Sequence, residues 1–218
     1  LQEGPAEPLV KRFATELGMH YVWFPGGWKG NEQYPGGFPG AVVTRYPIIE
    51  SESRPSAGAP HDGTLFTRHL GSAALDTPFG KLHVVSVHFH ASDHDARMRE
   101  AAAAVALIQN LHASGPVLLQ GDLNHRPEDP EYAVWRDAGL VDVAAPHATG
   151  QAATFSSTNP KGRIDYIWAT PDLGRTSMHA EVLNAPPFVP EPADAASYAL
   201  SDHMPVLADF DTSRVGRQ

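Results

Sequence analysis

The sequence contains no cysteine in its 218 residues. This absence excludes disulfide bonds, thiolate-bound zinc and a cysteine nucleophile, and it leaves both a bacterial cytoplasmic and a secreted location open. No apolar run approaches the roughly 20 residues that a membrane-spanning helix needs, and no repeat of fixed period indicates a solenoid. We therefore expect a globular chain without a transmembrane segment.

Basic residues are also scarce, with 16 Lys and Arg against 25 Asp and Glu, which gives a net charge of -9. A dedicated nucleic-acid binder usually carries a basic surface, so this charge disfavours that class. It does not exclude a nuclease, because acidic metal ligands contribute to the negative sum. Basic residues cluster only at Lys11-Arg12, at Arg97 with Arg99, and at Lys161 with Arg163.

The length suits one large domain with a full-sized core, and 42% hydrophobic with 19% charged residues is a globular composition. The chain opens at Leu1-Gln2-Glu3 without an initiator Met or a leader sequence, so we expect it to begin inside a domain. The expected organisation is a single domain over residues 1–210 with a frayed tail at 211–218. We also expect a monomer.

Apolar spacing and capping residues predict three helices, at residues 7–17, 93–111 and 131–138, with Gly18 as the stop signal of the first. The expected buried stripe of the first helix is Leu9, Val10, Phe13 and Leu17. Ser92 or Asp93 can cap the second helix. Its expected buried stripe is Met98, Ala102, Val105, Ile108 and Leu111.

Short β-rich runs are separated by segments that contain Gly and Pro. Strands are expected at residues 20–24, 41–46, 64–70, 82–88, 117–120, 164–169, 178–183 and 204–210. Loops are expected at 25–39, 51–62 and 186–196, and a hairpin connection at 76–80. Many strands with a few helices between them predict an α/β layered sandwich, in which two sheets pack face to face and helices lie outside.

Gly121-Asp122-Leu123-Asn124 follows a short apolar strand that begins at Val117. Asp122 and Asn124 are separated by one residue, so in an extended chain their side chains point to the same side. A carboxylate that can bind a hard cation and an amide would then share a pocket. An Asx-rich turn is an equally good interpretation of this tetrapeptide alone.

Ser201-Asp202-His203 stands directly before the last apolar strand. Histidine has a suitable pKa for taking a proton from water near neutrality, and a carboxylate partner fixes its tautomer. Asp165, at the start of another strand, is the candidate partner. A simple turn is again an alternative on spacing alone. His90 could share the face of His88, but an exposed loop residue is the favoured interpretation, and the other histidines are expected to be solvated.

Six different short segments are spread along nearly the whole chain. They are Leu1-Gln2-Glu3, Arg45-Tyr46-Pro47-Ile48, Val84-Val85-Ser86-Val87-His88, Gly121-Asp122-Leu123-Asn124, Arg163-Ile164-Asp165-Tyr166-Ile167 and Ser201-Asp202-His203-Met204-Pro205-Val206. Together they resemble the endonuclease/exonuclease/phosphatase superfamily, which has the deoxyribonuclease-I-like fold. The resemblance implies a four-layer α/β (α+β) sandwich of two packed, mainly antiparallel β-sheets flanked by helices.

The resemblance also implies a divalent-metal-dependent phosphoester hydrolase. Glu3 would hold Mg²⁺ or Mn²⁺, a hard cation that binds oxygen ligands and substrate phosphate, and Asp202 would be a second or water-mediated ligand. His203, oriented by Asp165, would deprotonate or orient the attacking water for an in-line displacement. Each of these roles is carried over from the family pattern.

Three further residues complete the implied site. Asp122 would place or activate the water, and Asn124 would hydrogen-bond the phosphate. His88 would donate to a non-bridging oxygen as negative charge develops. The family's first strand normally carries an Asn, and this chain starts after it. The chain also has Pro39-Gly40-Ala41 where many members have Gly-Asn-Ala.

The fold by itself does not determine the substrate. A small or lipid-like phosphoester is favoured because the chain is acidic and lacks a basic stripe. A Mg²⁺-dependent nuclease is the alternative. A non-catalytic binding module of the same fold is a third possibility, and the joint presence of Glu3, Asp122, Asn124, Asp165 and His203 argues against it.

Overall fold

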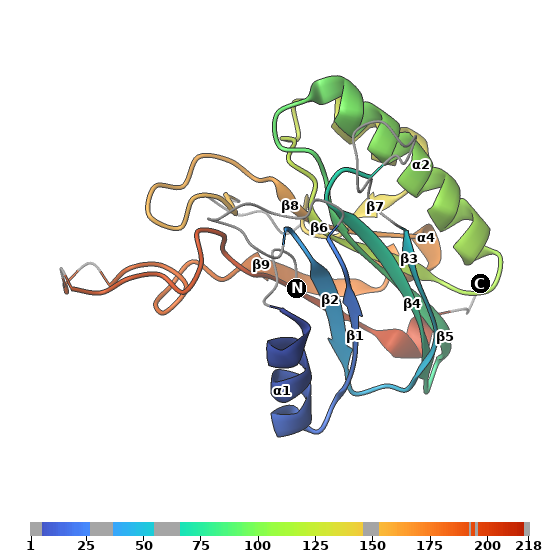
Figure 1. Ribbon diagram of the computed structural model, residues 1–218. Helices are drawn as coiled ribbons and strands as arrows, with labels where there is room; N and C mark the ends of the chain where they lie inside the picture. Colours follow the sequence, from blue (N-terminus) through green and yellow to red (C-terminus); the bar gives the residue numbers. More distant parts are fainter. Residues whose placement is uncertain are drawn as a thin grey trace. The chain divides into compact units, whose positions relative to one another are not determined.

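The computed structural model of the protein describes residues 6–26, 37–54, 66–145, 153–191, 193–194 and 196–215. The chain forms two compact units, unit 1 over Leu1–Asn124 and unit 2 over His125–Gln218, and each is described by itself (Figure 1). Within the described ranges, no helix is both long and apolar enough to cross a membrane. The expectation of a single domain over residues 1–210 stays a prediction.

Unit 1 begins with α1 (Glu7–Leu17), whose end at Gly18 is confirmed: Gly18 has φ 64°, and its backbone N–H bonds to the carbonyls of Ala14 and Thr15. That left-handed conformation favours glycine over residues with a Cβ. The expected buried stripe is mostly wrong, because only Val10 and Ala14 are buried. These two residues, four apart, are enough for a helix that packs on a narrow two-stranded sheet. About half of the side-chain surface stays exposed at Leu9, Phe13 and Leu17.

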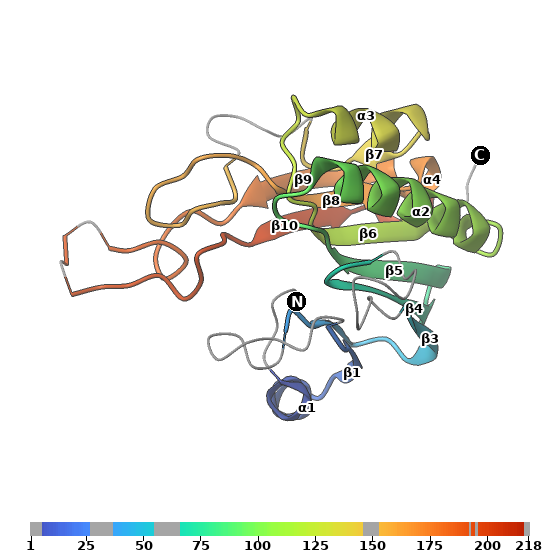
Figure 2. The same ribbon diagram turned by 45° about the horizontal axis from the view of Figure 1, so that its top comes forward.

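Two sheets of unit 1 pack face to face. One pairs β1 (His20–Phe24) with β2 (Gly40–Thr44), antiparallel. The other has the order β3 (Ile48–Arg54), β4 (His69–Thr77), β5 (Gly80–His88) and β6 (Val117–Asp122), in which only β5 and β6 are parallel. β1 and β2 contact β4, and α1 contacts both. Figure 2 shows the resulting layers of unit 1 in order: α2, the larger sheet, the β1–β2 pair and α1.

The core between these two sheets contains Phe24, Val42, Ala73, Leu75 and Val84. Burying a large apolar side chain of this kind contributes about 1.5–3 kcal/mol relative to leaving it exposed. Gly71 is required opposite Phe24, because a Cβ at residue 71 would lie 2.1 Å from the Phe24 ring. In this core Gly71, which has no side chain, therefore packs against the large ring of Phe24.

One loop prediction and one strand prediction in unit 1 are wrong in part. Residues 51–54 were expected in a loop, but they belong to β3, and the rest of that loop lies outside the described residues. The segment 64–70 was expected to be a strand: residues 69 and 70 open β4, His69–Thr77, residues 66–68 are not in a strand, and residues 64 and 65 lie outside the described residues. β3 is an exposed edge strand of mixed polar residues, and β4 is buried on both faces, so neither shows alternation of apolar and polar residues. The hairpin at 76–80 is confirmed by the Thr77–Gly80 pair.

Helix α2 (His94–His112) covers β6 and is capped by Asp93, whose side chain accepts from the Ala96 N–H. Its buried face differs from the expected stripe and shares only Ile108 with it. Burial of Glu100 explains the difference, since a count of apolar residues does not place a carboxylate inside. The residues that the helix buries are Ala96, Glu100, Ala101, Ala104, Leu107 and Ile108.

Glu100 is 0% exposed but fully hydrogen-bonded. One carboxylate oxygen accepts from the N–H and hydroxyl of Thr67 at 2.8 and 2.9 Å, and the other accepts from the N–H of His90 at 2.9 Å. Burial raises the pKa of Glu100 above its usual value, while these hydrogen bonds oppose that change. The carboxylate thus joins α2 to two loops of unit 1.

Unit 2 contains two antiparallel strand pairs and two α-helices that contact one of them. Its elements are α3 (Pro130–Asp137), β7 (Val141–Asp142), β8 (Asp165–Ala169), α4 (Pro171–Gly174), β9 (Ser177–Val182), β10 (Val206–Phe210) and the short 3-10 helix η2 (Thr212–Arg214). β7 pairs with β8, and β9 with β10, both antiparallel. α3 contacts β7, α4 contacts β7 and β8, and β10 contacts β8. The tail was expected to fray from Asp211, but residues 212–214 form η2, where the Asp211 carboxylate accepts from the Ser213 N–H; residues 216–218 lie outside the described residues.

The core of unit 2 is aromatic and contains Trp135 and Trp168, which are 0% and 2% exposed. Tyr166 stacks beside Trp168, with ring centroids 6.1 Å apart. A buried ion pair lies next to it: Arg163 donates to both carboxylate oxygens of Asp142, at 3.0 and 2.6 Å. The Arg163 side chain is therefore held in the interior of unit 2 by this ion pair.

Candidate functional site

The site residues of unit 1 lie where two parallel strands end together. His88 and Asp122 are the last paired residues of β5 and β6. The carboxyl ends of parallel strands share one edge of a sheet, so the register sets these two side chains against each other. His88 Nε2 lies 3.3 Å from Asp122 Oδ2, and the residues are 0% and 2% exposed.

Asn124 belongs to the same cluster. Its side-chain amide donates to Asp122 Oδ2 at 2.9 Å and to the Phe89 carbonyl at 3.1 Å, and its backbone N–H donates to Asp122 Oδ1 at 2.8 Å. Its φ is 52°, a left-handed conformation that asparagine tolerates better than most residues. The Asx turn and the functional cluster are therefore both present in one tetrapeptide. The amide donors are oriented by Asp122 and by the backbone.

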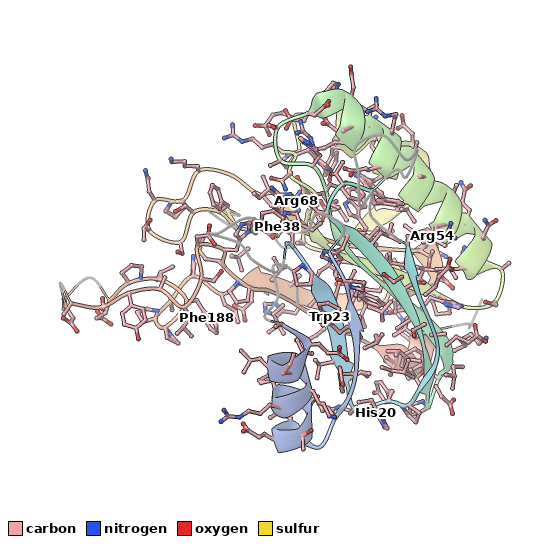
Figure 3. All side chains as sticks on the ribbon, viewed as in Figure 1. His20, Trp23, Phe38, Arg54, Arg68 and Phe188 are labelled. Carbon is pink, nitrogen blue, oxygen red and sulfur yellow. The ribbon has the colours of Figure 1, made fainter. Side chains whose placement is uncertain are left out.

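Arg68 joins this cluster, although the sequence did not single it out. Its guanidinium contacts His88 Nε2 and lies over the Phe38 ring, 4.0 Å from the centroid. Figure 3 shows Arg68 and Phe38 together at one end of the unit 1 strands. A guanidinium can donate two parallel hydrogen bonds to a phosphate, so Arg68 adds an anion-binding group. No pattern around residue 68 marks it, because its partners are distant in sequence.

The departure at Pro39-Gly40-Ala41 has a structural reason. His69 is 0% exposed; its Nδ1 lies 2.9 Å from the Phe38 carbonyl and its Nε2 lies 3.2 Å from Ser86 Oγ. A Cβ at Gly40 would lie 2.1 Å from His69 Nε2. An Asn at position 40 is thus incompatible with His69 as placed. Burial, followed by the neighbouring His88, lowers the pKa of His69 to about 3.

The expectation of solvated histidines is wrong for three buried residues, each of which has a hydrogen-bonding partner. These are His69, His83 and His125, paired with Ser86, Ser114 and Trp135. His90 was expected to be an exposed loop residue. It is partly buried, and its Nδ1 accepts from the N–H groups of Ser92 and Asp93, at the start of α2.

Unit 2 supplies the second group of site residues. Asp165, the first residue of β8, is 8% exposed, and its Oδ2 lies 2.9 Å from His203 Nδ1. This is the contact expected from the sequence. It fixes the ring so that Nε2, the atom that could take a proton from water, points away from Asp165. The catalytic role of the pair stays a prediction.

Residues 154–157 hold this pair in place. Thr154 Oγ1 accepts from the N–H groups of Ile164 and Asp165, both at 3.1 Å, and the Thr154 carbonyl accepts from Met204 N–H at 2.8 Å. The Phe155 ring lies 5.0 Å from the His203 ring. Thr154 is 0% exposed. The sequence carries no motif around Thr154, so its positioning role is visible only in the structure.

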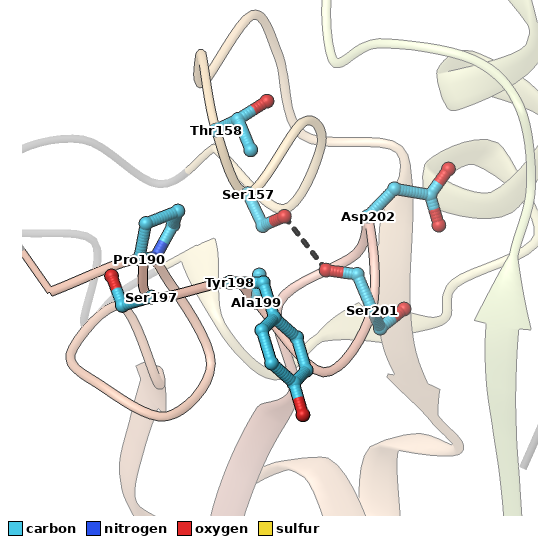
Figure 4. Close-up of a pocket in the computed structure, with 8 residues that line it drawn as sticks. All are labelled: Ser157, Thr158, Pro190, Ser197, Tyr198, Ala199, Ser201 and Asp202. Carbon is cyan, nitrogen blue, oxygen red and sulfur yellow. Dashed lines mark hydrogen bonds between the residues drawn. The ribbon is translucent and has the colours of Figure 1, made fainter. Parts of the chain in front are cut away.

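The remaining predicted site residues are less constrained. Asp202 is exposed, and its carbonyl accepts from Ser157 N–H at 2.8 Å. Asp202 also lines a small pocket (Figure 4). Glu3 lies outside the described residues. The chain has no cysteine, and Asp122, Asp165 and Asp202 each offer carboxylate oxygens, the type of donor that suits a hard divalent cation.

Comparison with known proteins identifies the family. The sequence profile of the "Endonuclease/Exonuclease/phosphatase family" matches residues 1–203. The chain belongs to this family. The resemblance to this superfamily that the sequence segments indicated is confirmed. Members of the family are phosphoester hydrolases. The chain is also 28% identical over 194 residues to the "Uncharacterized protein YbhP" of Escherichia coli, covering 87% of this chain and 69% of that protein.

Solved structures support the same fold. An endonuclease/exonuclease/phosphatase from Bacteroides vulgatus aligns with a TM-score of 0.68 at 20% identity, over 94% of this chain and 80% of that one. The 3′ phosphatase NExo from Neisseria, bound to a product DNA hairpin, aligns with 0.67 at 19% identity, over 97% and 87%. A mannosyl-6-phosphatase from Bacteroides thetaiotaomicron aligns with 0.63 at 19% identity, over 87% and 76%. The predicted fold class is therefore confirmed.

Proposed function

We propose that the protein is a divalent-cation-dependent phosphoester hydrolase in which His203, oriented by Asp165, activates the attacking water. The observation that carries the proposal is the 2.9 Å contact between His203 Nδ1 and Asp165 Oδ2 at a partly exposed position, with side chains 16% and 10% exposed. A carboxylate bonded to one imidazole nitrogen raises the basicity of the other. Family membership supports the reaction class.

In this proposal the cluster of unit 1 binds the phosphate. His88 and Arg68 of unit 1 are hydrogen-bond donors for the non-bridging oxygens, where negative charge grows in the transition state. The Asn124 amide donates to Asp122 and to the Phe89 carbonyl and so holds this cluster together. Asp122 orients the Asn124 amide and helps to place the attacking water. The donors are fixed by strand register and by buried hydrogen bonds, so little reorganisation is needed when the charge develops.

We propose that Asp202 and Glu3 hold a Mg²⁺ or Mn²⁺ ion. The donor set is entirely of oxygen atoms, which these hard cations prefer. The ion would supply Lewis-acid stabilisation of the phosphate and of the leaving oxygen. The role of Asp165 in this scheme is to orient His203.

A small phosphoester is the favoured substrate over a nucleic acid. Of the three basic clusters in the sequence, Arg163 is paired with Asp142 in the interior and Arg12 lies 2.8 Å from Glu16 in an exposed pair. A track for successive phosphates needs several available cations. The names of two similar structures, a 3′ phosphatase and a mannosyl-6-phosphatase, support phosphomonoesters as the first class to test.

The experiment compares hydrolysis of p-nitrophenyl phosphate, bis(p-nitrophenyl) phosphate, sphingomyelin and plasmid DNA with Mg²⁺, with Mn²⁺ and after EDTA. We expect turnover of the small esters that EDTA abolishes and added cation restores. Asp165→Asn should lower kcat by about 10²–10⁴ because the imidazole loses its orienting carboxylate. The matched control is Asp209→Asn, an exposed aspartate on β10, which should be unaffected.

Two results would overturn parts of the proposal. Efficient nicking of DNA with a steep dependence on salt would establish the nuclease alternative. An absence of cation-dependent turnover on every ester, with Asp122→Ala indistinguishable from the unmodified protein, would establish the non-catalytic binding module instead.

A further inference from the structure

The peptide group between Phe89 and His90, in unit 1, is hydrogen-bonded on both sides. Its N–H, which belongs to His90, donates to Glu100 Oε2 at 2.9 Å. Its carbonyl, which belongs to Phe89, accepts from the Asn124 side-chain amide at 3.1 Å, and the same amide donates to Asp122 Oδ2 at 2.9 Å. A continuous chain of hydrogen bonds therefore runs from the buried Glu100 to Asp122, the carboxylate that places the attacking water in the proposed reaction.

The other oxygen of Glu100 holds the segment that carries Arg68. Glu100 Oε1 accepts from the N–H and the hydroxyl of Thr67, at 2.8 and 2.9 Å. Thr67 directly precedes Arg68, and His69, on its other side, pairs with His88 in the ladder between β4 and β5. The Arg68 backbone is thus fixed on one side by a carboxylate and on the other by a sheet, and its guanidinium contacts His88.

A carboxylate is an unusual side chain for the buried face of α2. The helix lies over β6 (Figure 2), and the other residues that it buries are Ala, Leu and Ile. A buried charge is costly unless hydrogen bonds compensate for the lost water. An apolar side chain would fill the position of Glu100 without that cost, but it would accept from none of the three donors. The carboxylate is therefore explained by the segments that it holds.

The negative charge also strengthens the chain of hydrogen bonds. Three donors that converge on two oxygens favour the ionised form of Glu100. A charge that accepts from the N–H of a peptide group polarises that group, so its carbonyl becomes a stronger acceptor for the next donor. The bond from Asn124 to the Phe89 carbonyl is the next one in this chain.

We propose that Glu100 is a positioning residue that aligns the two halves of the unit 1 cluster, the water-placing Asp122 and the phosphate-binding Arg68. The proposal rests on the proposed function, because it assigns the alignment of two groups of that reaction to one buried carboxylate. Glu100 is 0% exposed, so it acts only through the residues that it holds.

The first test is spectroscopic and needs no turnover. Glu100→Gln keeps the size of the side chain but leaves one acceptor oxygen for three donors, so the backbone N–H of His90 or of Thr67 loses its acceptor. We expect that amide proton to move upfield in 1H–15N NMR spectra. The side-chain resonance at the end of the same branch should move with it: Asn124 Nδ2 for His90, or Arg68 Nε for Thr67. A merely structural role of Glu100 would move the backbone signal alone.

Kinetics separate the two branches. Glu100→Gln should lower kcat/KM for p-nitrophenyl phosphate by about five- to tenfold, because misplacement of aligned groups slows a reaction even when the change is remote. Thr67→Val removes only the hydroxyl bond and should raise KM by about two- to threefold with kcat retained, since it loosens a binding group alone. Thr67→Ser keeps the hydroxyl and should restore the KM of the unmodified protein.

Leu107→Ala is the matched control, because Leu107 is buried on the same helix and has no part in these hydrogen bonds. It should lower stability to urea but leave kcat/KM and the resonances of Asn124 and Arg68 unchanged. Equal kinetic losses in Leu107→Ala and Glu100→Gln, or a backbone shift without its side-chain shift, would overturn the proposal. Coupled shifts in a protein that hydrolyses no phosphoester would support the positioning by Glu100 and overturn only the proposed function.

Discussion

His88 and Asp122 in unit 1 stand opposite each other as the last residues of two parallel strands, whereas Asp165 and His203 in unit 2 meet between a strand and a loop. The first pair is buried, and its geometry follows from sheet register. The second is partly exposed and depends on hydrogen bonds from residues 154–157. The register of a regular sheet thus determines the position of the His88–Asp122 pair. For the Asp165–His203 pair, hydrogen bonds to the buried Thr154 have much of that role.

The largest expected effect tests this difference directly. His203→Ala should lower kcat on p-nitrophenyl phosphate by about 10²–10⁴ and change the free energy of unfolding by less than about 1 kcal/mol, because the side chain is partly exposed. Asp122→Ala should lose comparable activity and also about 1–3 kcal/mol of stability, since it leaves buried donors of Asn124 without an acceptor. Steady-state kinetics and urea denaturation measure both quantities.

His179→Ala, an exposed histidine on β9, is the control for His203→Ala. If His203→Ala destabilises the protein as much as Asp122→Ala does, the contrast between the two units is wrong.

The next effect concerns the buried carboxylate of unit 1. Glu100→Ala removes the acceptor for three donors on Thr67 and His90 and should destabilise the protein by about 2–4 kcal/mol. Urea denaturation gives the value. Glu16→Ala removes an exposed carboxylate paired with Arg12 and should cost less than about 0.5 kcal/mol. Similar costs for the two substitutions would show that the Glu100 network contributes nothing.

A pH effect should follow from His69 in unit 1. Burial lowers its pKa from 6.5 to about 3, so the unfolded chain binds this proton first as the pH falls. The contribution of His69 is therefore fully present above pH 6.5 and is lost toward pH 3, at no more than about 1.4 kcal/mol per pH unit. His69→Gln should flatten this acid limb in urea denaturation between pH 4 and 7. Parallel curves would contradict the assignment.

The smallest effect belongs to Thr154 in unit 2. Thr154→Val leaves the N–H groups of Ile164 and Asp165 without their side-chain acceptor and should cost about 1–2 kcal/mol. It should also lower kcat a few-fold with KM unchanged, because Asp165 orients His203. Thr154→Ser, which keeps the hydroxyl, should restore kcat. An unrestored kcat would mean that packing of the methyl group, not the hydrogen bonds, is what matters.

The sequence predicted elements whose signals are local. The cap at Asp93, the stop at Gly18 and the 76–80 hairpin depend on residues within a few positions of one another. β3 and β4 were misplaced because the edge strand is polar and the central strand is buried on both faces. The buried face of α2 was misjudged because Glu100 is satisfied by Thr67, which is 33 residues away.

By itself, the sequence determined the chemistry available to this protein: no thiol, few cations, and carboxylates, an amide and imidazoles at strand ends in the order of one family. Only the tertiary structure decided that Arg68 contacts His88, that Thr154 holds Asp165, and that Gly40 is matched to His69. Such contacts depend on the packing of segments far apart in the chain, and their energies leave no periodic trace in the residues themselves.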